Sequence, residues 1–380
     1  MRSDHITIEV ERQADTGARV VPFTTPMEIS MALPLPRLRL ATLALIGFGY
    51  SATALPALAF EAGTQWIQIN PSHRTQPERV LITYPAKADG DPYTLGADAL
   101  WVGVPARRNA TPVQEKFPLV ILSHGSGGNA AGLGWLSTEL ARNGFIVAAP
   151  NHIHSTSGDS IPVESFKIWE RAQDVSALID TLTTSATWSA LVDKERIGGI
   201  GFSLGGNTMM LTAGVRASLQ TFVTHCAEAG GRDAGCNWFQ KGGVDFSQVD
   251  REAFEGGYGD KRVSAVIAVD PGFAMAYQNE SLAGIDRPML FINLGEGDGI
   301  MSGTNAQSLT VDIPEANYAL VPGANHFSFL SICNANGAEL LKQYEDDPVC
   351  DEVSDIPREK LHQQIFFNIA VFLRRTLLER

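Results

Sequence analysis

Basic residues are scarce in this sequence. Its 380 residues include 29 Lys and Arg against 42 Asp and Glu, which leaves a formal net charge of −13 at pH 7. Nucleic-acid binding needs clustered basic side chains that neutralise phosphates, so this balance argues against nucleic acid as a main partner. Charged residues make up only 19% of the chain and hydrophobic residues 44%. That composition supports a large buried core and excludes a wholly disordered chain.

Repeats and cofactor motifs are missing as well. No segment recurs with a period of 20–50 residues, which excludes a repeat array. The sequence has no glycine-rich nucleotide loop and no cluster of metal-ligating residues, so we expect neither a cofactor nor a metal. The length suits one large α/β domain or two ordinary domains.

Cysteine is rare, with four residues at positions 226, 236, 333 and 350. No CxxC pair occurs, which argues against the alternative of a zinc site. Four cysteines allow three disulfide pairings. We favour the pairs Cys226–Cys236 and Cys333–Cys350, because each closes a short loop that is rich in Gly or in acidic residues. Such a bridge stabilises a fold by roughly 2–3 kcal/mol.

The N-terminal apolar run is too short for a membrane span, which needs about 20 residues. Residues 37–59 are instead typical of a secretory signal. Arg37 and Arg39 come first, an apolar stretch follows over 40–50, and the small residues Ala57 and Ala59 mark a cleavage site.

We therefore expect residues 1–59 to be an N-terminal extension plus a signal peptide that is removed, with a true start at Met27 or Met31. The mature protein would be periplasmic or secreted, with no stable membrane span. An uncleaved amphipathic anchor is the alternative.

From residue 60 onward, apolar strand patterns alternate with helical ones. Two edge-like strands are predicted at 65–70 and 79–84, followed by a loop rich in Gly, Asp and Pro. Further strands are predicted at 118–123, 144–149, 196–202, 263–269, 288–293 and 317–321, and helices at 133–143, 165–185 and 357–378. This rhythm predicts a single α/β domain over 60–380, with a mostly parallel central sheet flanked by helices.

Residues 219–261 interrupt the alternation. This Gly-rich stretch contains two of the cysteines and several aromatic residues, and it lies between two predicted strands. We interpret it as an insertion at one edge of the fold. It is either a lid over a pocket or a disulfide-tied loop without substrate contact, and the sequence favours neither.

The motif G-x-S-x-G occurs once with the context that its chemistry needs. It reads Gly201-Phe202-Ser203-Leu204-Gly205, directly after the predicted strand 196–202 and before a helical pattern. A strand–turn–helix of this kind lifts the serine hydroxyl clear of the sheet at a helix N-terminus. We predict Ser203 as the nucleophile, against the alternative of a glycine-lined turn with an incidental serine.

A serine hydroxyl needs a base, and the base needs a carboxylate that steadies it. Of the histidines after Ser203, His326 follows the predicted strand 317–321 and is our choice, because His225 lies in the cysteine loop and His362 in the last helix. Two acids follow strands before it, Asp270 and Asp298. The pattern alone leaves these two open.

The negative charge of an acyl-transfer intermediate needs N–H donors. One is expected from Leu204, the residue after the nucleophile. The other is expected from the loop after strand 118–123, which reads His124-Gly125-Ser126-Gly127-Gly128, and we choose the N–H of Ser126. His124 is interpreted as a support for this turn rather than as the catalytic base.

The segments SHGSGG, GFSLGG, AVDPGF and ANHFSFL, in this order, resemble the α/β-hydrolase superfamily. More narrowly, they are similar to secreted bacterial dienelactone-hydrolase-like proteins that are related to platelet-activating-factor acetylhydrolases. The likeness runs from about residue 64 to the end, and it includes the TYPA strand and the cysteines at 333 and 350. It departs from true dienelactone hydrolase, whose nucleophile is cysteine, because this chain has Ser203. In the acetylhydrolase relatives the acid follows an earlier strand, which implies Asp270 rather than Asp298.

These features predict a secreted serine hydrolase that cleaves carboxylic esters, and we expect its substrates to be small-molecule or lipid-like esters with short acyl groups. The same site could also serve an acyltransferase, a peptidase or a polyester hydrolase, since these reactions share a nucleophile and differ in pocket shape. A non-catalytic binding protein on a hydrolase scaffold is the remaining alternative, and the intact Ser, His and Asp set argues against it.

Overall fold

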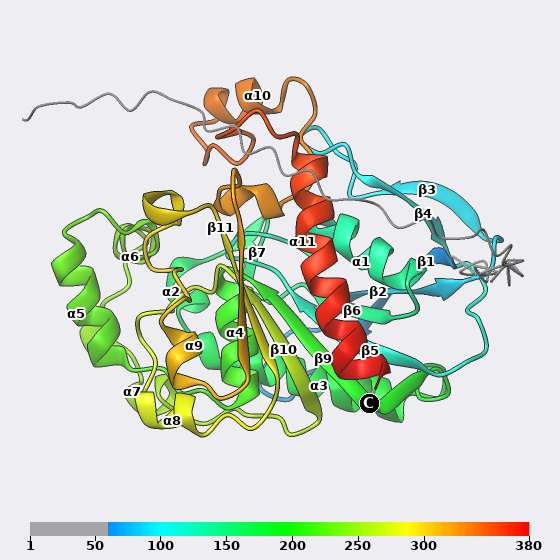
Figure 1. Cartoon of the computed structure of the whole chain (residues 1–380), viewed down its shortest axis with the longest axis horizontal. Coiled ribbons are helices and arrows are strands. Elements are labelled where there is room, and N and C mark those ends of the chain that lie inside the picture. Colours follow the sequence, from blue (N-terminus) through cyan, green and yellow to red (C-terminus); the bar gives the residue numbers. More distant parts are fainter. Residues whose placement is uncertain (1–59, 380) are drawn as a thin grey trace, which may run out of the picture. The chain divides into compact units, whose positions relative to one another are not determined.

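One ten-stranded sheet organises residues 60–379, the part of the chain that the computed structural model describes (Figure 1). The predicted signal segment 37–59 lies outside the described residues. In spatial order the strands are β12 (Ala316–Val321), β11 (Met289–Leu294), β10 (Val263–Val269), β9 (Val192–Phe202), β5 (Phe117–Ser123), β6 (Ile146–Pro150), β2 (Glu78–Ala86), β1 (Glu61–Ile69), β4 (Val104–Arg108) and β3 (Asp91–Leu95). The strands from β12 to β6 all pair in parallel, so the predicted mostly parallel α/β fold is confirmed.

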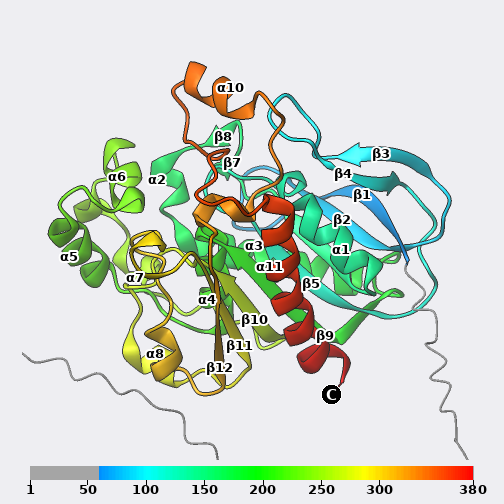
Figure 2. The ribbon, with the colours of Figure 1, turned by 45° about the horizontal axis from the view of Figure 1, so that its top comes forward.

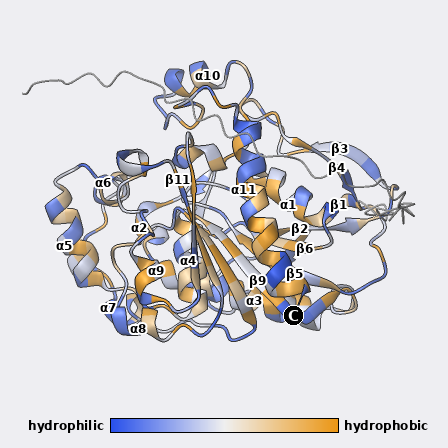
Figure 3. Ribbon diagram, viewed as in Figure 1, coloured by the Kyte–Doolittle hydropathy of each residue, from blue (hydrophilic) through white to orange (hydrophobic). Residues whose placement is uncertain are grey.

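Helices cover both faces of the sheet. Helices α3 (Ile168–Thr184) and α4 (Leu204–Ala213) belong to one hydrophobic cluster, and α1 (Gly134–Arg142) and α11 (Arg358–Leu373) to the other. The central strands are predominantly apolar because both faces are covered, as the hydropathy colouring shows (Figure 3).

The remaining elements lie outside this central framework, and most of them are short. They are α2 (Pro162–Ser165), α5 (Leu219–Ala229), α6 (Ala234–Lys241), α7 (Arg251–Phe254), α8 (Asn279–Ala283), α9 (Leu309–Asp312), α10 (Gly337–Gln343), the two-stranded ribbon β7 (Ser155–Thr156) and β8 (Asp159–Ser160), and several single turns. The predicted long helices differ from α1, α3 and α11 only at their ends. The last of them passes from α11 into a π-helical turn over Arg374–Leu378.

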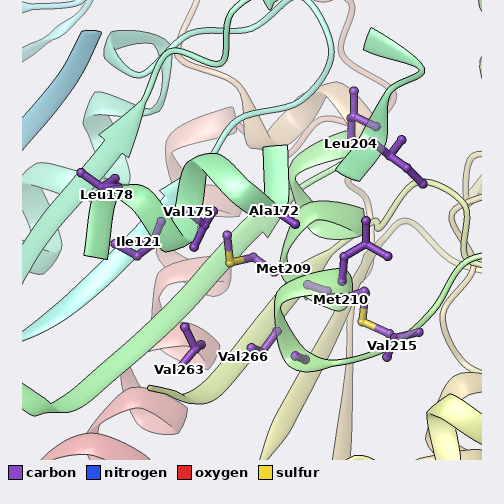
Figure 4. Packing of buried hydrophobic residues seen from close by; sticks show 14 of the residues in the cluster. Ile121, Ala172, Val175, Leu178, Leu204, Met209, Met210, Val215, Val263 and Val266 are labelled. Carbon is purple, nitrogen blue, oxygen red and sulfur yellow. The ribbon is translucent and has the colours of Figure 1, made fainter. Parts of the chain in front are cut away.

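Close contact between sheet and helix fixes the site region. Side chains of α3 and α4 meet those of β5 and β10 in one cluster (Figure 4). Gly199 in β9 makes room for α4, because a Cβ there would lie 2.4 Å from the sulfur of Met209. The helix that follows Ser203 is therefore held tightly against the strand that precedes it.

The edge of the sheet was predicted wrongly. Strands 65–70 and 79–84 were expected at an edge, but β2 lies between β6 and β1, inside the sheet. The segment expected to be a Gly-, Asp- and Pro-rich loop contains the hairpin β3–β4, and β3 forms the edge. An edge strand tolerates proline and a polar, half-exposed pattern, so this hairpin lacks the apolar signal of a central strand.

The insertion 219–261 is helical rather than loop-like. It contains α5, α6 and α7, which lie on the opposite side of the domain from β3 (Figure 2). Its aromatic side chains pack inward: Phe222 stacks on Phe273, and Phe254 is fully buried against Phe166. The helices have only 11, 8 and 4 residues, and the Gly-rich segments between them obscure a helical period in the sequence.

The four cysteines form two disulfides in the predicted pairs. Cys226–Cys236 joins α5 to α6, and Cys333–Cys350 closes the segment that contains α10. Within residues 60–379, no helix combines the length and the apolar character that a membrane crossing requires.

Candidate active site

Ser203 stands in a strained turn between β9 and α4. Its backbone has φ +56° and ψ −120°, a region that side chains rarely adopt. Glycine is required on both sides, because a Cβ on Gly201 would lie 1.9 Å from the carbonyl oxygen of Gly205, and one on Gly205 would lie 2.0 Å from that of Ser123. The Ser203 side chain remains partly exposed at the N-terminus of α4.

The structure brings Ser203, His326 and Asp270 together. His326 Nε2 lies 3.1 Å from Ser203 Oγ, and His326 Nδ1 lies 2.9 Å from Asp270 Oδ2. Asp270 directly follows β10, and His326 begins a 3-10 turn after β12. Because β10 and β12 run parallel to β9, all three residues meet at the carboxyl ends of the strands.

Packing and capping hold the imidazole in place. The ring of Phe202 lies 4.7 Å from that of His326, centroid to centroid. Asn325 caps the turn by accepting from the N–H of Ser328, whose hydroxyl accepts in return from the N–H of Asn325. The rotation of the His326 side chain is therefore restricted by both ring contact and backbone.

Asp270 is oriented by Asn293, a residue that the sequence analysis did not single out. Asn293 Nδ2 donates to Asp270 Oδ1 at 2.7 Å, and the N–H of Leu294 donates to the same oxygen at 2.9 Å. Asn293 is fully buried at the end of β11. The signal was an amide within the otherwise apolar run PMLFINL, because a buried polar side chain must find partners.

The other candidates lie elsewhere. Asp298 is exposed in the turn Gly297–Gly299, and within residues 60–379 no hydrogen bond joins it to His326. His225 bonds Asp233 inside the insertion, and His362 stacks on Trp135 at 3.9 Å while bonding the carbonyl of Leu330.

The two residues predicted to supply N–H donors lie at the start of α4 and in the loop after β5. Leu204 is the first residue of α4, so its N–H has no acceptor within the helix. Ser126 is exposed in the loop after β5. That loop packs directly on the nucleophile, because a Cβ on Gly125 would lie 3.1 Å from Ser203 Cβ.

A second Ser–His–Asp chain lies buried behind this loop. Ser123 Oγ is 2.9 Å from His152 Nε2, and His152 Nδ1 is 2.8 Å from Asp174 Oδ2. All three residues are 0% exposed. Burial lowers the pKa of His152 to about 3, so this imidazole is a poor base at neutral pH. This buried Ser–His–Asp series was not predicted from the sequence, and its signal was the presence of polar and charged residues next to predicted core positions.

Among residues 60–379, two clusters have the residue types of a metal site. In His225, Asp233 and Cys236 the sulfur is committed to a disulfide and cannot act as a thiolate ligand. In Glu78, His152 and Asp174 the Asp174 carboxylate already accepts from Arg74 and His152. The neighbouring guanidinium of Arg74 makes that second cluster unfavourable for a further cation.

Acid should destabilise the fold through buried histidines. Burial lowers the pKa of His152 to about 3, that of His362 to about 4, and that of His124 well below its usual range. Each is neutral when folded but gains a proton when unfolded below about pH 6.5, which costs about 1.4 kcal/mol per pH unit for each proton. Burial raises the pKa of Glu78, so above about pH 4.5 this carboxyl keeps a proton in the folded state that it loses on unfolding. This proton release cancels the proton uptake of one histidine.

We therefore expect the free energy of unfolding, measured by urea titration, to fall by about 2–3 kcal/mol per pH unit from about pH 6 to 4.5. His362→Gln should reduce that slope by about 1.4 kcal/mol per pH unit. A pH-independent stability over this range would contradict the prediction.

Known proteins resemble this one in fold and in one short segment. The family described as platelet-activating factor acetylhydrolase, isoform II, matches residues 101–165. A solved ferulic acid esterase from Streptomyces cinnamoneus superposes with a TM-score of 0.56 at 18% identity, covering 87% of this chain and 93% of that one. This chain has the fold of that esterase. The sheet order and the strand–turn–helix at Ser203 are consistent with this structural likeness.

A second solved structure is less similar. A protein from Klebsiella pneumoniae named as a candidate dienelactone hydrolase has a TM-score of 0.46 at 12% identity, covering 82% of this chain and 98% of its own. No protein of curated function matches the sequence. The family match contains the loop 124–128 but ends before Ser203, Asp270 and His326.

Proposed function

We propose that this protein is a secreted serine hydrolase that cleaves carboxylic esters with short acyl groups. The observation that carries the proposal is the hydrogen-bonded series Ser203–His326–Asp270 at the strained turn. The acetylhydrolase family that matches residues 101–165 supports ester hydrolysis and a short acyl group.

The geometry supports a covalent mechanism in two steps. Ser203 Oγ attacks the ester carbonyl while His326 Nε2 takes its proton. Asp270 accepts from Nδ1–H of His326 and stabilises the imidazolium that forms. His326 then returns the proton to the leaving alcohol, and water, activated by the same imidazole, releases the acyl group.

We further propose that the N–H groups of Leu204 and Ser126 bind the oxyanion. Each such donor contributes about 3 kcal/mol to transition-state stabilisation. The free N–H at the start of α4 supports the first assignment, and the contact of Gly125 with Ser203 supports the second.

Residues 60–380 would then be a single catalytic domain, with 219–261 acting as a lid. Asp233 of this insertion accepts from Ser302 Oγ at 3.2 Å, and Thr304 in the same loop accepts from Asn293, which holds Asp270. These contacts connect the insertion to the proposed acid. The two disulfides support export to an oxidising compartment, the periplasm or the exterior.

A panel of p-nitrophenyl esters with graded acyl length tests this function on the oxidised protein. We expect kcat/KM to be highest for acetyl and propionyl esters and to fall by about tenfold or more towards octanoyl, because a short pocket rejects extra methylenes. A rate that rises with acyl length would exclude the short-acyl assignment. Turnover of no ester at all would contradict the proposed function itself.

A further inference from the structure

Arg171 is a buried cation that the ester-cleaving steps do not use. It lies on α3 with 2% of its surface exposed, and its guanidinium faces the strands rather than solvent. Burial lowers its pKa to about 9, so it remains charged at neutral pH. A buried charge destabilises the folded state by several kcal/mol unless it is paired and hydrogen-bonded. The partners of Arg171 therefore indicate what its buried position achieves.

The guanidinium donates to four groups from four segments. Nε donates to Thr208 Oγ1 at 3.0 Å, Nη1 to Ser155 Oγ at 2.7 Å, and Nη2 to Ser123 Oγ at 3.2 Å and to the carbonyl oxygen of His124. Thr208 lies in α4 directly after the nucleophile, whereas Ser123 and His124 end β5 and begin the loop 124–128. One side chain therefore ties together the segments on both sides of Ser203.

The carbonyl contacts set the direction of the loop amides. The carbonyl of His124 accepts from Arg171, and the carbonyl of Gly125 accepts from His124 Nδ1–H at 2.7 Å and from the N–H of Gly128 at 3.1 Å. In a planar trans peptide the N–H points opposite to the C=O. The N–H of Ser126 is consequently turned away from the buried ring of His124.

The rest of the loop 124–128 is held by hydrogen bonds to residues 155 and 157. The N–H of Gly127 donates to the carbonyl of Ser155 at 3.0 Å, and the N–H of Ser157 donates to the carbonyl of Gly128 at 2.8 Å. Ser155 is also the acceptor of Arg171 Nη1, so Arg171 holds both the loop and the ribbon strand β7 that borders it.

We propose that Arg171 is a positioning residue for the oxyanion loop, which fixes the main chain of residues 124–126 against Ser203. This inference rests on the proposed function, because it assumes that Ser126 N–H binds the oxyanion. Arg171 acts through the loop and touches neither substrate nor the reacting atoms. Its effect should therefore appear in the transition state and not in the binding of the ester.

The test compares Arg171→Met and Arg171→Lys with Arg287→Met in the full protein. Arg287 is a matched control, because its Nη1 also holds two main-chain carbonyls, those of Asp260 and Val263. Val263 begins β10, so this contact lies about 23 Å along the strand from Asp270. Removing Arg287 should affect stability without reaching the loop.

We expect both Arg171 variants to lower kcat for p-nitrophenyl acetate by about 30- to 100-fold while KM changes less than about threefold. Inhibition by a trifluoromethyl ketone, which forms a tetrahedral oxyanion on the serine, should weaken by about tenfold or more. Arg287→Met should keep kcat within about twofold of the wild-type value, even where its melting temperature falls.

Folded Arg171 variants with wild-type kcat, or an equal loss in Arg287→Met, would overturn the positioning role. Should Arg171→Met fail to fold, Ser155→Ala decides, since it removes one acceptor of the guanidinium: a fall in kcat of about 3- to 10-fold supports the role, and an unchanged kcat overturns it. The activity of the wild-type protein distinguishes a failure of the proposed function from a failure of the role of Arg171. An inactive wild type defeats the proposed function together with this inference, whereas an active wild type with fully active variants defeats only the role of Arg171.

Discussion

Ser203→Ala should lower kcat for p-nitrophenyl acetate by about 10⁴- to 10⁶-fold, since no other group can form the acyl-enzyme. The fold should be retained. The hydroxyl makes a hydrogen bond to His326 Nε2, and alanine fills nearly the same volume at the same strained backbone position. Activity is measured from p-nitrophenolate release, and folding from circular dichroism and the melting temperature.

Ser126→Ala is the matched control for this variant. It removes a serine hydroxyl that is exposed on the neighbouring loop but keeps the main-chain N–H that is proposed to bind the oxyanion. Its kcat should stay within about threefold of the wild-type value. Retention of more than about one hundredth of the wild-type rate in folded Ser203→Ala would refute Ser203 as the nucleophile.

Asp270→Asn should lower kcat by about 10⁴-fold, as expected when an amide replaces the carboxylate behind a catalytic imidazole. Asp270 Oδ2 accepts from His326 Nδ1 at 2.9 Å, so the substitution removes the charge that stabilises the imidazolium and allows the wrong tautomer. Initial rates across substrate concentrations separate this loss in kcat from any change in KM.

Asp298→Asn provides the comparison, since both acids follow neighbouring parallel strands. Asp298 is exposed, and its substitution should change kcat by less than about threefold. A larger loss in Asp298→Asn than in Asp270→Asn would reverse the assignment of the acid.

The residues that meet at the site could be found from the sequence because each follows a predicted strand. Buried parallel strands read as continuous apolar runs, and a polar residue directly after such a run lies at the edge where ligands bind. Ser203 and Asp270 occupy such positions, whereas His326 lies in the loop after β12, which is a partly exposed edge strand. The choice between Asp270 and Asp298 was not contained in that pattern, because both residues satisfy it.

The supporting residues were harder to predict. Arg171 and Asp174 lie on the same face of α3 as the apolar residues Ile168 and Val175, but charged residues are expected at the surface. Their burial becomes understandable only when their partners are known. Thr208 and Arg74 are 37 and 100 residues away from Arg171 and Asp174 respectively, separations over which helical periodicity carries no information.

The structure of the insertion 219–261 could not be predicted from the sequence for a different reason. Its short helices have no long amphipathic period, and besides the Cys226–Cys236 disulfide it is held by aromatic contacts with residues outside it, such as Phe222 with Phe273 and Phe239 with Phe166. A segment stabilised by long-range packing cannot be assigned from its own composition.

Labelling of the oxidised wild-type protein with a fluorophosphonate, followed by peptide mass spectrometry, tests the central claim most directly. We expect one adduct per chain, located on Ser203, and loss of that adduct in Ser203→Ala but not in Ser126→Ala. A folded protein that takes up no label, or that carries it on another residue, would contradict the account.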